Sequence, residues 1–160
     1  MELDQVYRDN VNDLYRYLYS LSKDHFIAED LVQESFYRAY LHLEDYEISN
    51  IRAWLFKVAY HAFIDLLRKN KRFVIQEPKE ERHSSKETPE KRLLEKESFQ
   101  LLINDIHSLK EQEKHVLLLC DLHQLSYSEA AEILEMNLNT LKSHLHRGRK
   151  KVMEKVKERK

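Results

Sequence analysis

Glycine and proline are almost absent from this chain, which has one glycine and two prolines in 160 residues. Tight β-hairpins depend on glycine for backbone conformations with positive φ, so a sheet built from hairpins is excluded. A glycine-rich phosphate-binding loop is excluded for the same reason. Nearly every segment instead repeats its apolar residues at the helical spacing of three and four positions. We therefore predict an all-α fold.

Cysteine is scarce too, and no long hydrophobic run is present. Cys120 is the only cysteine, so an intramolecular disulfide is impossible, and we expect a buried thiol in a reducing compartment. The paired cysteines of zinc sites are missing, and we predict neither a metal site nor a cofactor. No apolar run approaches the roughly 20 residues that span a bilayer, and the N-terminus lacks the features of a signal peptide. We expect a cytoplasmic protein.

The formal net charge of −1 hides a strong segregation of charge along the chain. Residues 1–50 carry 4 basic against 11 acidic side chains, whereas residues 51–72 carry 6 against 1. Residues 101–141 carry 2 against 7, and residues 142–160 carry 9 against 2. Blocks of this size favour separate partners of opposite charge. We expect one end to bind a protein and the other to bind DNA.

The apolar pattern divides the chain into two helical modules. Residues 1–73 form a three-helix bundle, with helices predicted over residues 3–21, 28–43 and 51–72. Between residues 74 and 92 the periodicity fails, and both prolines occur there among polar and charged side chains, so we predict a flexible linker. Residues 93–160 resume the helical pattern and contain a helix-turn-helix.

The helix over residues 28–43 has two distinct faces. Its predicted buried stripe consists of Ala28, Leu31, Val32, Phe36, Ala39, Tyr40 and Leu43. Asp30, Gln33 and Glu34 fall on the opposite face. An acidic, amide-bearing surface is therefore expected on the outside of this helix, where it can dock a protein.

Aromatic and basic side chains share the helix over residues 51–72, which Ser49 or Asn50 can cap. We expect Trp54, Val58, Ala62 and Leu66 to lie in the core. Basic side chains with exposed aromatics suit a single nucleic-acid strand, because unstacked bases lie on the rings while cations neutralise the backbone. The candidates for contact with nucleic acid are Asn50, just before this helix, and Arg52, Lys57, Tyr60, His61 and Arg68 on it.

The helix-turn-helix is marked by two capping signals. Ser126 and Glu129 have the spacing of a capping box, and Asn137 can cap the helix that follows the turn. The second helix of such a motif lies in the major groove of DNA, where its first residues reach base edges. Its candidate base-reading residues are Asn139, Lys142, Ser143, His146 and Arg147, and its candidate phosphate contacts are Arg149, Lys150, Lys151 and Lys155.

Three motifs, in this order, closely resemble those of bacterial sigma factors of the extracytoplasmic function group. They are Asp30-Leu-Val-Gln33-Glu34-Ser-Phe36, then Ala53-Trp-Leu-Phe-Lys-Val-Ala59 with Ile64-Asp-Leu-Leu-Arg68, then Thr140-Leu-Lys-Ser143-His-Leu-His-Arg147-Gly-Arg149. Together they cover nearly the whole chain except the predicted linker.

The resemblance implies an alternative sigma factor that initiates transcription of a stress-response regulon. It implies that residues 1–73 correspond to sigma region 2 and residues 93–160 to region 4. In region 2, Asp30, Gln33 and Glu34 match the motif that docks on RNA polymerase core. The loop from Asp45 to Asn50 and the helix with Lys57 and His61 match the part that captures a flipped base of the minus 10 element. In region 4, the matching minus 35 readers are Lys142, Ser143, His146 and Arg147.

The resemblance also implies restraint by an anti-sigma factor, often membrane-anchored, with the active protein bound to the nucleoid. Three positions depart from the family pattern. Tyr60-His61 replaces a frequent Arg-Asn, and His144 replaces a frequent Arg. Glu135 stands where a glycine is usual in the turn, so we expect the turn to be made with Asn137 or with a less strained backbone.

Other classes of protein fit the chain less well. An enzyme would need a site, yet His115, Cys120 and His123 lack any zinc-site framework, and no nucleophile elbow is present. A two-domain regulator that binds an operator is the main alternative, but it does not need the acidic face or the basic aromatic helix. A pure interaction module would show no salt-sensitive DNA binding.

Overall fold

The structure is a computed structural model and describes residues 3–42, 50–72 and 87–159. These residues are helical with turns between the helices and include no strand, which confirms the all-α prediction for this part of the chain. The chain divides into two compact units, and the boundary lies between Lys91 and Arg92. Residues 43–49 and 73–86, which include Leu43 and most of the predicted linker, lie outside the described residues.

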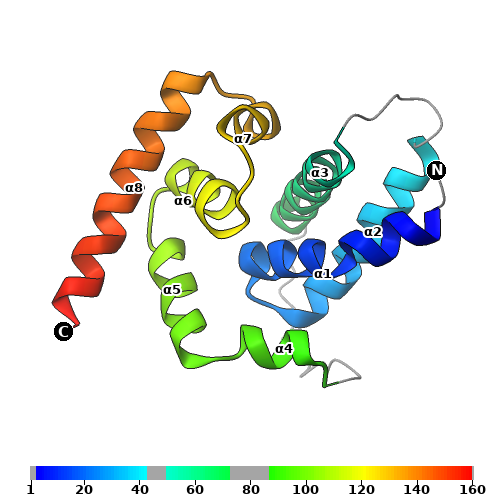
Figure 1. The fold of residues 1–160 in the computed structure, drawn as a ribbon, viewed down its shortest axis with the longest axis horizontal. Coiled ribbons are helices and arrows are strands. Elements are labelled where there is room, and N and C mark those ends of the chain that lie inside the picture. The colour runs from blue at the N-terminus through cyan, green and yellow to red at the C-terminus, as the bar shows by residue number, and fades with distance from the viewer. Residues whose placement is uncertain (1–2, 43–49, 73–86, 160) are drawn as a thin grey trace. The chain divides into compact units, whose positions relative to one another are not determined.

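The first unit is built on three helices that pack against one another, α1 (Leu3–Ser22), α2 (His25–His42) and α3 (Ile51–Arg72) (Figure 1). The predicted break between the first two helices is confirmed. Lys23 adopts a left-handed backbone with φ of 58°, and Asp24 caps α2 by accepting from the amides of Phe26 and Ile27 at 2.8 and 3.0 Å. This cap starts α2 three residues earlier than predicted.

The buried face of α3 differs from the predicted one. The buried residues of α3 are Leu55, Phe56, Ala59, Ala62 and Phe63. Ala62 was predicted correctly, but Trp54, Val58 and Leu66 are only half-buried. The reason lies in α1, where the buried ring of Tyr17 stacks on Phe56 with ring centroids 4.7 Å apart. This contact turns Phe56 inward and moves Trp54 toward the edge.

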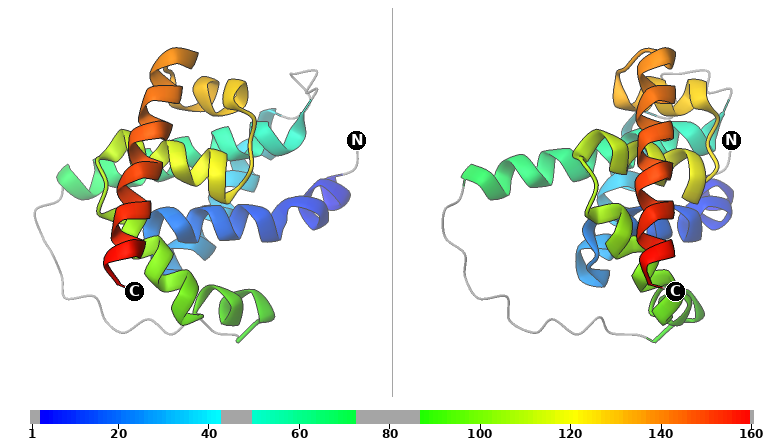
Figure 2. Two further views of the ribbon diagram at one scale, coloured as in Figure 1. Left: turned by 60° about the vertical axis from the view of Figure 1, so that its left-hand side comes forward. Right: turned by 90° about the vertical axis from the view of Figure 1, so that its left-hand side faces the viewer.

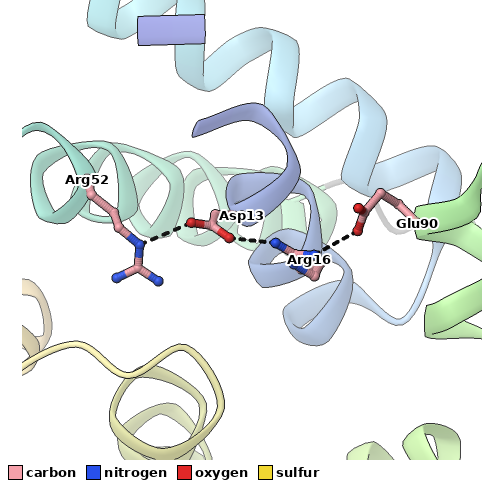
Figure 3. Close-up of polar contacts among 4 residues, drawn as sticks. All are labelled: Asp13, Arg16, Arg52 and Glu90. Atoms are coloured by element: carbon pink, nitrogen blue, oxygen red, sulfur yellow. Dashed lines mark hydrogen bonds and ion pairs between the residues drawn. The ribbon is translucent and has the colours of Figure 1, made fainter. Parts of the chain in front are cut away.

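The short helix α4 (Pro89–Leu94) begins on the first unit, so the last four residues of the predicted linker are helical. Arg16 of α1 lies between Asp13 and Glu90 at 2.7 and 2.9 Å, and Asp13 in turn contacts Arg52 of α3 at 3.2 Å (Figure 3). Lys91, only 4% exposed, pairs with Glu29 of α2 at 2.6 Å. These ion pairs hold the start of α4 on α1 and α2.

The second unit contains four α-helices after α4, which are α5 (Glu97–His107), α6 (Glu111–Leu117), α7 (Tyr127–Leu134) and α8 (Leu138–Glu158). A single π-helical stretch, η1 (Leu118–Leu122), continues α6. The long helix α8 packs against α5, α6 and α7 (Figure 2). The core lies beneath α8 and includes Ile103, Val116, Leu118, Leu119, Leu141 and Leu145. Cys120 is buried, as predicted.

Gly148 sets the closeness of α6 and α8. A Cβ atom added to Gly148 would overlap the Cδ1 atom of Leu117 and lie 3.5 Å from the Cβ of Glu113. The single glycine of the chain therefore serves a close approach between two helices rather than a turn.

Candidate protein-binding and nucleic-acid-binding surfaces

The acidic face of α2 is where the sequence predicts it. Asp30, Gln33 and Glu34 are exposed, while Ala28, Leu31, Val32 and Ala39 on the other side are buried. Within the part of the chain that the structure describes, Asp30 and Gln33 form no side-chain hydrogen bond or ion pair. Their carboxylate and amide are therefore available to a partner.

Glu34 differs because it belongs to a chain of ion pairs that joins two helices. Arg38 of α2 donates to Glu34 at 2.9 Å and to Asp65 of α3 at 2.8 Å. The two carboxylates hold the guanidinium between the helices. This bridge fixes the acidic face of α2 relative to α3.

Apolar side chains extend this face toward the end of α2, and sequence reasoning missed them. Tyr37 is 62% exposed and Leu41 is 54% exposed. They follow Glu34 at three and seven positions, so they share its side of the helix. That spacing could have found them. Tyr40 was predicted to be buried, which is wrong, because it is 58% exposed and Ser35 completes the buried stripe instead.

The candidate nucleic-acid contacts on α3 and at its N-terminal cap divide into two groups. Asn50, Lys57, His61 and Arg68 follow one another at intervals of seven, four and seven residues, which places them on one face of the helix. Asn50 caps α3 by accepting from the amide of Ala53 at 3.1 Å, so one of the two predicted caps is confirmed. Arg68 is well exposed, and Lys57 and His61 are half-buried.

Arg52 and Tyr60 lie off that face. Arg52 points toward α1, where it pairs with Asp13 (Figure 3). Its guanidinium carbon also lies over the ring of Phe56, 4.8 Å from the centroid. The pKa of Asp13 is lowered, because hydrogen bonds from Arg16 and Arg52 outweigh the cost of burying its carboxylate. Tyr60 contacts His61 with ring centroids 5.7 Å apart. The structure thus gives Arg52 a structural contact between α1 and α3.

The start of α8 has the predicted capped geometry. Ser126 and Glu129 form the capping box of α7, and Asn137 caps α8 by accepting from the amide of Thr140 at 2.8 Å. Asn139, Lys142, Ser143 and His146 are exposed on the first turns of α8. These residues form one outward row, as the helical spacing predicts.

The turn before α8 corrects one expectation. Glu135 itself adopts the left-handed conformation, with φ of 54° and ψ of 46°. Met136 donates to the carbonyl of Ala131 at 3.0 Å and Glu135 donates to Glu132 at 3.3 Å, which is the hydrogen-bond pattern of a Schellman motif. The turn therefore keeps the geometry that usually employs glycine, at the strain cost of a side chain.

The cations farther along α8 are held by carboxylates of the same unit. Arg149 donates to both oxygens of Asp121 at 2.9 and 2.6 Å, and this pairing raises the pKa of Arg149. Lys151 contacts Glu113 at 2.8 Å, and Arg147 lies 3.6 Å from the other oxygen of Glu113. Lys150 is exposed. Sequence reasoning missed both carboxylates, since they lie 28 and 38 residues from their partners.

The described residues contain neither a candidate metal site nor a candidate membrane span. No group of three or more histidine, cysteine, aspartate or glutamate side chains in residues 3–42, 50–72 and 87–159 could hold a metal ion. Over the same ranges, no helix is long and apolar enough to cross a membrane.

Comparison with known proteins places the chain in a family. Residues 6–73 match the family model of Sigma-70 region 2, and residues 100–152 match that of Sigma-70 region 4. The extracytoplasmic function (ECF) RNA polymerase sigma factor SigM of Bacillus subtilis is 50% identical over 74 residues, which cover 46% of this chain and 45% of SigM. RNA polymerase sigma factor YlaC of Bacillus subtilis is 32% identical over 167 aligned residues, covering 95% of this chain and 96% of YlaC. The chain belongs to the ECF group of the sigma-70 family.

The fold of this sigma factor agrees with that assignment. The sigma factor RpoE, solved in complex with the anti-sigma factor NepR from Bartonella quintana, superposes with a TM-score of 0.75. The two sequences are 25% identical, and the match covers 96% of each chain. The match to SigM, by contrast, spans less than half the length of SigM. The faces of α2 and α3 fall within the region 2 match, and the outward row of α8 falls within the region 4 match.

Proposed function

We propose that this sigma factor binds bacterial RNA polymerase core, directs it to promoters with minus 10 and minus 35 elements, and so initiates transcription. The observation that carries the proposal is the presence of two kinds of exposed face on one chain. The face of α2 is acidic and amide-bearing, while those of α3 and α8 are basic and polar. A factor that joins a protein to DNA needs both.

The face of α2 is the proposed contact with the polymerase core. Asp30, Gln33 and Glu34 supply charge and hydrogen-bonding groups, and Tyr37 and Leu41 add apolar area beside them. Protein interfaces commonly combine an exposed aromatic anchor with a polar rim. The Arg38 bridge to Asp65 supports this role because it holds the face rigid.

The face of α3 is the proposed contact with the minus 10 element. Asn50, Lys57, His61 and Arg68 form the row that would follow an unpaired strand, and Tyr60 stands beside it as a ring on which a base could stack. Arg52 contributes indirectly in this proposal, since it is engaged with Asp13 and Phe56. Trapping unpaired bases offsets the free energy of melting the duplex.

The outward row of α8 is the proposed minus 35 reader. Asn139 can pair with adenine, and Lys142 and Arg147 can donate to guanine. Ser143 and His146 can contact bases or phosphates, and the exposed Lys150 can neutralise phosphate. Arg149 reaches phosphate only if it shares its pairing with Asp121.

The sigma factor has no proposed catalytic step, because the polymerase carries out the chemistry, and it would act in the cytoplasm, on the nucleoid. An anti-sigma factor is a further proposed partner, supported by the RpoE structure with its NepR partner. Such a partner would cover one or both modules, and its own membrane anchor could hold the complex at the membrane. Release would then switch on a stress-response regulon.

Charge reversal on α2 tests the polymerase contact. Asp30→Lys and Glu34→Lys should each abolish binding to purified core polymerase and promoter-dependent transcription, with helicity unchanged by circular dichroism. Asp9→Lys is the matched control, since Asp9 is an exposed carboxylate on α1, and it should retain binding. Normal core binding by Asp30→Lys and Glu34→Lys would contradict the docking assignment.

A further inference from the structure

Glu113 is a buried carboxylate on α6 that reaches into the exposed cationic surface of α8. Its side chain is 1% exposed, whereas the side chains of Arg147 and Lys151 are 53% and 41% exposed. One carboxylate oxygen contacts the Lys151 ammonium at 2.8 Å, and the other lies 3.6 Å from the Nε of Arg147. Glu113 therefore lies between two cations that stand one turn apart on α8.

The position of Glu113 depends on the packing of α6 against α8. Gly148 lies between Arg147 and Lys151 in sequence, and its missing side chain leaves room for the side chains of Glu113 and Leu117 of α6 against α8. Removing one partner of a buried ion pair leaves an uncompensated charge, which is costly. The hydrogen bond from Lys151 lowers the pKa of Glu113, so the carboxylate stays ionised at neutral pH.

The guanidinium of Arg147 is thereby held on its inner side. Its Nε faces Glu113, and its Nη2 lies 3.0 Å from the Nδ1 of His144. Nη1 forms no hydrogen bond or ion pair within the described residues, and Nη2 carries a second hydrogen besides the one that can face His144. A bidentate contact with guanine O6 and N7 uses two parallel N–H groups of one guanidinium.

We propose that Glu113 is a positioning residue for minus 35 recognition, which orients the guanidinium of Arg147 toward a guanine. The inference rests on the proposed function of α8 and adds a residue that never touches DNA. Arg147 stands four positions after Ser143, on the face that reads the groove, whereas Glu113 reaches it from behind. Without the contact to Glu113, the side chain of Arg147 would sample many rotamers and lose part of its preference for one base.

The test measures base preference rather than affinity alone. Full-length sigma factor is assembled with bacterial core polymerase and incubated with a duplex promoter library randomised over the minus 35 element, and the bound DNA is sequenced. The wild type should prefer guanine at one position, and Arg147→Ala should remove that preference. Glu113→Gln, of equal size, should reduce the same preference roughly tenfold and leave the other positions unchanged.

Two further variants show whether Glu113 acts through Arg147. The double variant Glu113→Gln with Arg147→Ala should lose no more preference than Arg147→Ala does. Asp121→Asn is the matched control, because it removes a carboxylate that holds Arg149 on α8. This control should leave the base preference unchanged at every position.

A further variant covers the case in which Glu113→Gln fails to fold. Glu113→Met with Lys151→Met replaces the ion pair by apolar side chains of similar volume, a change that folded proteins often tolerate. It should flatten preference at the Arg147 position as Glu113→Gln does. Unchanged preference in a folded Glu113 variant would overturn the inference, as would an equal loss at every position. A wild type without any minus 35 preference would instead overturn the proposed reader function itself.

Discussion

The acidic face of α2 and the cationic part of α8 use their charges in different ways. The side chains of Asp30 and Gln33 on α2 form no hydrogen bond or ion pair within the described residues, whereas the carboxylate of Glu34 accepts from Arg38. On α8, Arg149 is paired with Asp121, and Arg147 and Lys151 lie against Glu113. Charge counted along the sequence therefore overstates how much of α8 is available to DNA.

This difference has a physical reason. The side chains of Asp30 and Gln33 stand opposite the buried stripe of α2 and are exposed. The cations at the middle of α8 flank Gly148, where α6 comes closest and brings its own carboxylate. Close packing thus converts part of a DNA-binding surface into structural ion pairs. The following predictions test the contrast between the two units.

The largest expected effect is in the core of the first unit. Phe56→Ala removes a buried ring that stacks on Tyr17, and should destabilise that unit by about 3–5 kcal/mol. Trp54, the only tryptophan, reports on this unit in a urea titration followed by fluorescence. Leu118→Ala in the second unit should leave the Trp54 transition in place. Equal shifts of that transition by both variants would show that the units unfold together.

The second unit should lose more stability in acid than the first. Burial and the neighbouring Lys114 lower the pKa of His115 in the second unit from 6.5 to about 4. The unfolded chain then binds the extra proton below pH 6.5, so this unit should lose up to about 3 kcal/mol as the pH falls from 7 to 4. Lowered pKa values of Asp105, Glu111 and Glu113 extend the loss to lower pH.

In the first unit, burial raises the pKa of Tyr17 well above 10, so the unfolded state releases the proton first as the pH rises. Its stability should fall above pH 10. Amide exchange measured by NMR across pH 4 to 7 compares the acid responses of the two units, and a urea titration followed by Trp54 fluorescence between pH 9 and 11 tests the alkaline response of the first unit. His115→Gln should remove the acid sensitivity above pH 4.5. An acid response carried mainly by α1 to α3 would contradict this assignment.

A larger side chain at Gly148 should lower the stability of the second unit and leave that of the first unit unchanged. Gly148→Val places side-chain atoms against Leu117 and should cost about 2–3 kcal/mol by urea titration of circular dichroism. Because α8 would be pushed from α6, minus 35 preference should fall with it. Met153→Val is the control, since this exposed position of the same helix lies outside the proposed DNA-reading row and has room for the side chain. Equal stability of Gly148→Val and the wild type would refute the close approach.

The smallest predicted effect is a gain in stability. Glu135 holds a left-handed backbone that glycine adopts at no steric cost, so Glu135→Gly should stabilise the second unit by about 1 kcal/mol. Glu132→Gly, at a regular helical position of α7, should destabilise it by a similar amount. A higher melting temperature for the first variant and a lower one for the second would bear this out. A lower melting temperature in both variants would contradict the prediction, because it would mean that the Glu135 side chain stabilises the second unit by more than its backbone strain destabilises it.

The features that the sequence predicts well are local. The helices and the caps at Ser126 and Asn137 follow from spacings of three and four residues, and so does the exposure of Asp30 and Gln33. The buried stripe of α3 could not be predicted, because apolar side chains occur on several of its sides. The ring of Tyr17, 39 positions before Phe56 in the printed sequence, decides which side turns inward.

The ion pairs of α8 could not be predicted from the sequence, because their partners also lie far away along the chain. Nothing in the spacing of Glu113 or Asp121 indicates a partner 38 or 28 residues away. Tyr40 and Glu135 show two further limits. Tyr40 lies at the edge of a helical stripe, where burial depends on the neighbouring helix. Glu135 adopts a left-handed backbone, although a residue with a side chain disfavours that conformation.

The most direct test of the central claim is transcription in vitro from a genomic promoter library, using purified bacterial core polymerase with and without this sigma factor. We predict transcripts that appear only when the sigma factor is present, from start sites that share minus 10 and minus 35 elements. The absence of such transcripts, together with sequence-specific duplex binding by the chain without core, would contradict the claim and indicate an operator-binding regulator.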